Sequence, residues 1–264
     1  MAKVQSNGIA INYQIDGPDD APWLTFVTGI TNDLTMWDQH IPVLSERYRL
    51  LRLDTRGHGG SESTPAPYSF DQLSDDVLGV WDALGIERSI MVGIGLGGVT
   101  TIATALRAPD RLVAIVPTSC RTDLIPTFVD LWTPMIADST AHGIEAIVER
   151  TATRWFPQVF QEENPELMAN VRAQIRATSV DGYHGCIAAL LTTDFKPRLG
   201  ELSMPALFIS GALDTVGAPS DVMVDMAAAA PNGRYVALSG AGHISNMASP
   251  RQFETAVLDF VDSL

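Results

Sequence analysis

The stretch Ser89-Ile90-Met91-Val92-Gly93-Ile94-Gly95-Leu96-Gly97-Gly98 decides how this chain folds. Its first four residues form a short apolar run typical of a buried strand, and Val99–Arg107 after the glycines is typical of a helix. A strand that turns sharply into a helix can present the middle residue of the turn as a nucleophile, which is normally serine. Here that middle residue is Gly95. The turn is built for nucleophilic catalysis, yet it lacks the atom that would attack.

Strand and helix patterns alternate on both sides of this turn, and they predict a mostly parallel sheet covered by helices. Strands are predicted at Ile9–Ile15, Trp23–Thr28, Leu50–Asp54, Ser89–Val92, Leu112–Pro117, Ala206–Ser210 and Arg234–Leu238. Helices are predicted between them at Met36–Tyr48, Phe70–Leu84, Gly97–Arg107, Ser220–Ala229 and Pro250–Val261.

The strand signal disappears between Arg121 and Asp194. That region holds only helix-like segments, broken by prolines and a glycine: Thr127–Ile136, Ile144–Arg154, Pro165–Thr178 and Gly182–Leu191. We therefore expect an α/β core made of residues 1–120 and 195–264, with residues 121–194 inserted as a helical lid.

Composition narrows the possible partners. The 264 residues are 46% hydrophobic, enough for a full core, and 17 basic against 31 acidic residues give a net charge of −14. An acidic surface repels phosphate backbones, so we expect no nucleic-acid partner. The two cysteines, Cys120 and Cys186, cannot form a disulfide framework, and no apolar segment has the length of a membrane span or the character of a leader. These features predict a soluble, cytoplasmic protein that contacts no membrane.

Two further loops follow predicted strands and carry polar residues. Asp214 lies in Gly211-Ala212-Leu213-Asp214, and His243 lies in Gly240-Ala241-Gly242-His243. In an open parallel sheet, ligands bind beyond the carboxyl ends of the strands, so these loops should meet the turn at Gly95. The chain order of nucleophile position, aspartate and histidine is that of a hydrolytic triad, in which the histidine is the general base and the aspartate orients it. We expect His58, in Arg56-Gly57-His58-Gly59, to be structural instead.

Several of these segments resemble the α/β-hydrolase superfamily. Asp54–Ser61, Leu84–Arg88 and the turn with Gly97-Gly98 carry the general resemblance, which covers nearly the whole chain. Three other segments look most like 3-oxoadipate enol-lactonases: Asp33–Trp37, Gly182–Ala189 and Gly242–Asn246. The chain departs from that pattern at Gly95.

The resemblance implies roles for particular residues. Gly95, Asp214 and His243 take the triad positions, and the backbone amides of Ile30 and Leu96 take the oxyanion positions. Trp132, Trp155 and Tyr183 become candidate pocket aromatics, although ordinary packing in the core or the lid explains each of them better. The implied substrate is a small, carboxylate-bearing lactone or ester from the breakdown of aromatic compounds. We expect no cofactor, and no His, Cys and carboxylate cluster has the spacing of metal ligands.

The glycine leaves three interpretations open. The chain is a disabled form of a serine enzyme that binds its ligand without turnover, or it is a natural enzyme in which His243 and Asp214 activate a water molecule or deprotonate the substrate. In the third interpretation, the chain is a receptor that binds a ligand on a hydrolase scaffold without catalysis.

Gly93, Gly95 and Gly98 also match the dinucleotide-binding fingerprint G-x-G-x-x-G. Several predicted strands precede them, and no acidic residue ends the next strand, so the context of a dinucleotide site is missing.

Overall fold

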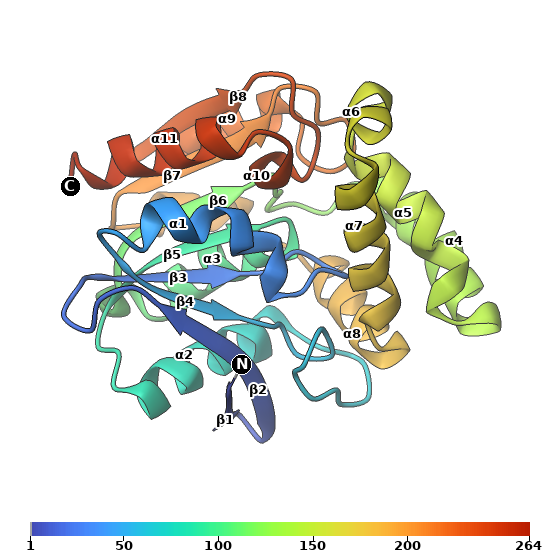
Figure 1. Ribbon diagram of the computed structural model, residues 1–264, viewed down its shortest axis with the longest axis horizontal. Coiled ribbons are helices and arrows are strands. Elements are labelled where there is room, and N and C mark those ends of the chain that lie inside the picture. The colour runs from blue at the N-terminus through green and yellow to red at the C-terminus, as the bar shows by residue number, and fades with distance from the viewer. Residues whose placement is uncertain (1) are drawn as a thin grey trace.

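Eight strands form one sheet in the computed structural model, which describes residues 2–264 (Figure 1). Their order across the sheet is β1-β2-β4-β3-β5-β6-β7-β8. The strands are β1 (Ala2–Ser6), β2 (Ile9–Asp16), β3 (Trp23–Val27), β4 (Arg49–Leu53), β5 (Ser89–Ile94), β6 (Leu112–Thr118), β7 (Ala206–Gly211) and β8 (Gly233–Leu238). All seven predicted strands are present, each with its ends within two residues of the prediction.

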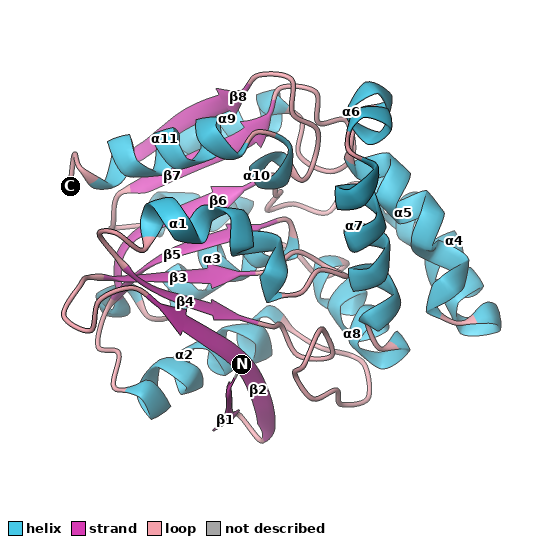
Figure 2. Cartoon of the chain, viewed as in Figure 1, coloured by secondary structure: helices cyan, strands magenta, loops and turns pink. Residues whose placement is uncertain are grey.

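Strands β3 to β8 run parallel, and only β1 and β2 are antiparallel to their neighbours. Parallel neighbours need crossover helices, which cover both faces of the sheet and explain why central strands such as β5 and β7 are buried along their whole length. In Figure 2, α1 and α11 lie in front of the sheet, and α3 and α9 lie behind it. The predicted fold class is confirmed.

The α-helices are α1 (Ile41–Leu44), α2 (Phe70–Leu84), α3 (Leu96–Arg107), α4 (Pro126–His142), α5 (Val148–Trp155), α6 (Gln158–Glu163), α7 (Pro165–Ala177), α8 (Val180–Leu190), α9 (Ser220–Ala229), α10 (Ser245–Ala248) and α11 (Pro250–Val261). Short 3₁₀ helices are η1 (Leu34–His40), η2 (Pro109–Arg111), η3 (Ile144–Ile147) and η4 (Lys196–Glu201). Helix α2 has the predicted bounds because Ser69 caps its start and Gly85, in left-handed backbone, ends it.

Helices α4 to α8 form a separate helical layer beyond the ends toward which the arrows of β3 to β6 point (Figure 1). We call this group the α4–α8 layer. It lies where ligands bind in open parallel sheets, so the cavity described below has one wall of sheet-edge loops and one wall of helices.

Local predictions were wrong where short polar or proline-containing segments had to be interpreted. Strand β1 was not predicted because it is a mostly exposed edge strand. The helix expected at Met36–Tyr48 is divided into η1 and α1, with Pro42 in the first turn of α1. Helix α4 was expected to end at Ile136 but continues to His142. Pro134 within it costs one backbone hydrogen bond, to the carbonyl of the exposed residue Asp130. The short helices α6 and α10 were also missed.

Candidate active site

Gly95 is the only residue between strand β5 and helix α3. Its backbone angles are φ 54° and ψ −115°, a conformation that side-chain-bearing residues adopt only under strain. Its amide donates to the carbonyl of Thr118 at 2.9 Å, and its carbonyl accepts from the amide of Val99 at 3.1 Å. The sharp turn expected of a nucleophile position is therefore present with glycine in it.

The glycines around this turn are required for different reasons. A Cβ atom on Gly93 would lie 2.1 Å from the carbonyl oxygen of Gly97, and one on Gly97 would lie 2.5 Å from that of Val27. A Cβ on Gly95 would meet only Nε2 of His243, at an ordinary contact distance of 3.6 Å. Packing forces glycine at positions 93 and 97. At position 95 there is room for a side chain, and it would point at the imidazole.

His243 and Asp214 come together from the loops after β8 and β7. His243 Nδ1 lies 2.9 Å from Asp214 Oδ2, and the His243 amide donates to the carbonyl of Trp155 at 2.9 Å. Burial raises the pKa of the Asp214 carboxyl, but its interaction with His243 and the amides of Val216 and Gly217 outweigh that effect, so the pKa lies below its ordinary value. The aspartate is ionised at neutral pH and holds the ring with Nε2 toward Gly95.

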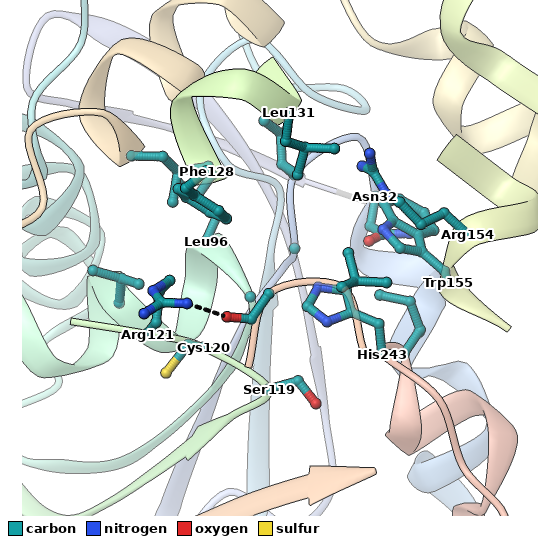
Figure 3. A pocket seen from close by; sticks show the side chains of 18 of the residues that line it. Asn32, Leu96, Ser119, Cys120, Arg121, Phe128, Leu131, Arg154, Trp155 and His243 are labelled. Atoms are coloured by element: carbon teal, nitrogen blue, oxygen red, sulfur yellow. Dashed lines mark hydrogen bonds between the residues drawn. The ribbon is translucent and has the colours of Figure 1, made fainter. Parts of the chain in front are cut away.

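A small cavity of about 40 Å³ lies over this arrangement (Figure 3). In the close view, Arg154 and Trp155 lie on one side of it and Phe128 and Leu96 on the other, with His243 between them. The loops at the sheet edge contribute Gly29, Ile30, Asn32, Gly95, Ser119, Gly217 and His243 to the lining, and the α4–α8 layer contributes Phe128, Leu131, Trp132, Arg154, Trp155 and Leu190.

The backbone amides of Ile30 and Leu96 both belong to this lining. Leu96 is the first residue of α3, so its amide has no partner within the helix. Among residues 2–264, neither amide has a hydrogen-bond partner. Two buried, unpartnered N–H groups beside the Gly95 turn have the character of donors for an oxygen that develops negative charge.

The three predicted pocket aromatics are placed differently from one another. Trp132 and Trp155 line the cavity, whereas Tyr183 is not part of its lining. Tyr183 is buried behind Trp132, with ring centroids 6.3 Å apart in an edge-on arrangement. On α8 it shares a face with Leu190, which does line the cavity, but it lies two turns, about 10 Å, farther along the helix.

Sequence reasoning missed Arg154, which enters the cavity from α5. Its guanidinium lies over the ring of Trp132, 5.7 Å from the centroid, and its Nε is buried without a hydrogen-bond partner. Burial lowers the pKa of this guanidinium, and no carboxylate among residues 2–264 forms an ion pair with it. Trp132 Nε1 is also buried and unpartnered. The sequence shows only that a basic residue precedes Trp155 at the end of a predicted helix. It does not show that this residue lacks a carboxylate partner.

His58 is fully buried and has a different environment from His243. Its Nδ1 donates to the carbonyl of Arg56 at 3.0 Å, and burial lowers its pKa to about 4. It does not line the cavity. Over residues 2–264, no group of three or more His, Cys, Asp or Glu side chains is arranged to hold a metal ion, and no helix is long and apolar enough to cross a membrane.

Comparison with known proteins agrees with this geometry. Residues 22–250 match the family described as alpha/beta hydrolase fold. The chain belongs to this family. A curated relative is 3-oxoadipate enol-lactonase 2 of Acinetobacter baylyi, 32% identical over 258 residues that cover 94% of this chain and 92% of the relative.

Solved α/β-hydrolase structures superpose closely on this chain. An enol-lactonase from Burkholderia xenovorans LB400 has a TM-score of 0.95 and 33% identity, covering 99% of this chain and 100% of its own. A hydrolase from Pseudomonas aeruginosa PA01 has a TM-score of 0.91 and 34% identity, covering 98% and 97%. The resemblance to enol-lactonases expected from the sequence is confirmed, and relatives that act on ester-like and lactone bonds share the fold over its full length.

Proposed function

We propose that this chain hydrolyses a small lactone or ester that carries a carboxylate, similar to the enol-lactones named for its relatives. The observation that carries the proposal is the orientation of His243. Its Nδ1 is held by Asp214, and its Nε2 lies 3.6 Å from the position that a Cβ atom of Gly95 would take. A base oriented in this way toward open space next to two free amides suits acyl transfer.

The chemistry follows from the protonation of this pair. Ionised Asp214 accepts the Nδ1–H of His243, which leaves Nε2 free to accept a proton. A water molecule held over Gly95 gives a proton to Nε2 and attacks the carbonyl carbon of the substrate. The amides of Ile30 and Leu96 stabilise the oxyanion. The protonated imidazole then returns the proton to the departing oxygen, and the ring or ester C–O bond breaks.

The donors from the α4–α8 layer favour an acidic substrate. The guanidinium of Arg154 has no carboxylate partner in the described chain, and Trp132 Nε1 is a second unpartnered donor in the same lining. A half-buried charge without a partner is costly, so a bound carboxylate would stabilise it. We assign Arg154 to the carboxylate arm, and Trp132 and Trp155 to the walls around the ring.

Access to the site requires motion. By volume, a cavity of about 40 Å³ holds only a few water molecules, less than a lactone with a side arm needs. We therefore propose that residues 121–194 act as a lid that opens for substrate, while residues 1–120 and 195–264 carry the reacting groups. The two free, buried cysteines suit a reducing cytoplasm, and the substrate class suits breakdown of aromatic compounds.

The test compares the native chain with His243→Ala on a carboxylate-bearing enol-lactone. Loss of a general base should reduce turnover by about 10²–10⁴-fold. His142, exposed at the end of α4, provides the matched control, because His142→Ala should leave turnover unchanged. Equal rates for the native chain and His243→Ala would overturn the proposal. Saturable binding without turnover would support a receptor, and activity that appears only with Gly95→Ser would indicate a disabled serine enzyme.

A further inference from the structure

Asn32 carries a polar atom that the proposed chemistry does not use. It lies in the loop after β3, lines the cavity and is 1% exposed. Within the part of the chain that the structure describes, its Oδ1 is buried and has no hydrogen-bond partner. A buried oxygen without a donor costs free energy, so a molecule that fills the cavity binds better when it supplies one.

A chain of hydrogen bonds fixes which atom of the Asn32 amide is free. The carboxylate of Asp33 can only accept, and it accepts from the hydroxyl of Thr35. The Thr35 oxygen therefore accepts from Gln174 Nε2, at 2.9 Å. Gln174 Oε1 is then left to accept from Asn32 Nδ2, at 3.1 Å. The free atom of Asn32 is thus its oxygen, which needs a donor.

This oxygen lies against the loop that carries Ile30. A Cβ atom on Gly29 would lie 2.8 Å from Asn32 Oδ1, closer than a normal contact, so glycine at position 29 leaves room for the oxygen. Gly29 and Asn32 line the same cavity as Arg154. In the close view, Asn32 is on the same side of the cavity as Arg154 and Trp155 (Figure 3). The free acceptor therefore belongs to the part of the cavity that we assign to the carboxylate arm.

On the proposed function, Arg154 binds the carboxylate of the substrate, and that carboxylate offers Asn32 only further acceptor oxygens. We propose that Asn32 is a specificity-determining residue, whose Oδ1 accepts a hydrogen bond from a hydroxyl group on the arm that bears the carboxylate. A neutral hydroxyl suits this position better than an ammonium group, which the guanidinium of Arg154 would repel. The substrate class narrows to lactones or esters with a hydroxylated carboxylate arm.

The test uses three enol-lactones with the same carboxylate-bearing arm, which carries hydrogen, hydroxyl or methoxy on the carbon next to the carboxylate. The change in absorbance on ring opening measures turnover. Because the unsubstituted lactone leaves a buried acceptor unsatisfied, the native chain should have a kcat/KM about 10–100-fold higher for the hydroxy lactone. The methoxy lactone has no donor and should be no better than the unsubstituted one.

Variants test whether Asn32 causes this preference. Asn32→Leu removes the acceptor, so the ratio of kcat/KM for the hydroxy and unsubstituted lactones should fall to within about twofold of one. Gln174→Leu frees the amide to rotate and should lower the ratio about threefold or more. Asn170→Leu is the matched control, because Asn170 is exposed one turn before Gln174 on α7. The ratio compares two substrates on one protein, so a smaller folded fraction does not change it.

The outcomes separate this inference from the proposed function. Turnover without a preference for the hydroxy lactone, or the native ratio retained in Asn32→Leu, would overturn the inference and leave the hydrolysis proposal intact. If no lactone turns over above the His243→Ala rate, quenching of tryptophan fluorescence measures binding, because Trp132 and Trp155 line the cavity. Tighter binding of the hydroxy lactone would then support the inference and contradict hydrolysis. Equal binding of all three lactones, or no binding, would overturn both.

Discussion

The two walls of the cavity differ in how their polar groups are satisfied. At the sheet edge, His243 and Asp214 are bonded to each other and to backbone, so their geometry is fixed whether or not a ligand is present. In the α4–α8 layer, Arg154 Nε and Trp132 Nε1 are buried without partners. On the proposed function, the edge is preorganised for bond breaking, and the layer is complementary to the carboxylate of a bound substrate. Changes at the edge should therefore alter kcat, and changes in the layer should alter KM.

The largest effect should come from Gly95→Ser, which adds a hydroxyl to the preorganised wall. The new Cβ meets only His243 Nε2, so the side chain fits with its oxygen near the base. Loss of the nucleophile in a serine triad costs on the order of 10⁶ in kcat, so we expect at least about 10²-fold faster turnover of p-nitrophenyl acetate. Stopped-flow kinetics should show a burst of p-nitrophenol, and intact-mass analysis should show an acetylated protein.

Ser119 offers the comparison for that experiment, because this residue lines the cavity and its buried hydroxyl has no hydrogen-bond partner. If the native chain is itself acetylated, and Ser119→Ala removes the acetyl group, then the sheet edge already contains a nucleophile. The expected difference in mechanism between the native chain and a serine enzyme would then be absent.

The same contrast explains which features could be predicted from sequence. Four predicted site residues lie two to five residues after the end of a strand: Ile30, Leu96, Asp214 and His243. Strands with strong apolar patterns are easily recognised, and topology places their carboxyl ends together. Arg154 and Tyr183 lie on helices whose mutual packing is set by side-chain contacts across the layer, which periodicity within one helix does not determine. The residues that we propose as reacting groups were therefore predictable, whereas Arg154, the proposed cation for the substrate, was missed and Tyr183 lay outside the cavity lining.

A buried histidine, His58, lies where a loop at the sheet edge contacts the α4–α8 layer, and it should make the free energy of unfolding depend on pH. His58 lies in the loop whose Gly57 carbonyl accepts from the amide of Ser179, beside α8. Its pKa of about 4 in the fold is below its value of about 6.5 in an unfolded chain. The contribution of neutral His58 to the free energy of unfolding is fully present above pH 6.5. It is lost as the pH falls toward 4, because in that interval the unfolded chain binds a proton at this histidine and the folded chain does not. The loss amounts to about 3 kcal/mol.

Urea denaturation at pH 7 and pH 4.5 measures this difference. In His58→Asn, the free energy of unfolding should depend less on pH over that interval than in the native chain. His142→Asn, at an exposed position, should keep the native dependence. An equal pH dependence of the free energy of unfolding in the native chain and in His58→Asn would show that His58 is not a neutral, buried histidine in the fold.

Removal of the unpaired charge tests the layer wall. Arg154→Met should lower kcat/KM for a carboxylate-bearing lactone by about 10–100-fold, because a hydrogen bond to a charged group contributes about 1.5–3 kcal/mol. The change should appear in KM and be absent for an uncharged lactone. Arg150, one turn earlier on α5, pairs with Asp138 at the surface, so Arg150→Met is the control. Equal losses on charged and uncharged lactones would mean that Arg154 only supports the fold of the layer.

The smallest effect should be the stability cost of a side chain at the turn. Gly95 has φ 54° with room for a Cβ atom, so Gly95→Ser introduces backbone strain without a steric clash. Such strain costs about 1–3 kcal/mol, partly offset by the lower conformational entropy that serine has in the unfolded chain, which leaves a net destabilisation of about 1 kcal/mol. Thermal unfolding should give a lower Tm for Gly95→Ser than for the native chain. Gly200→Ser, at an exposed glycine with open space, should not lower Tm in the same way. An unchanged or higher Tm for Gly95→Ser would mean that the turn relaxes around the new side chain, and the sheet edge would be less rigid than its hydrogen bonds indicate.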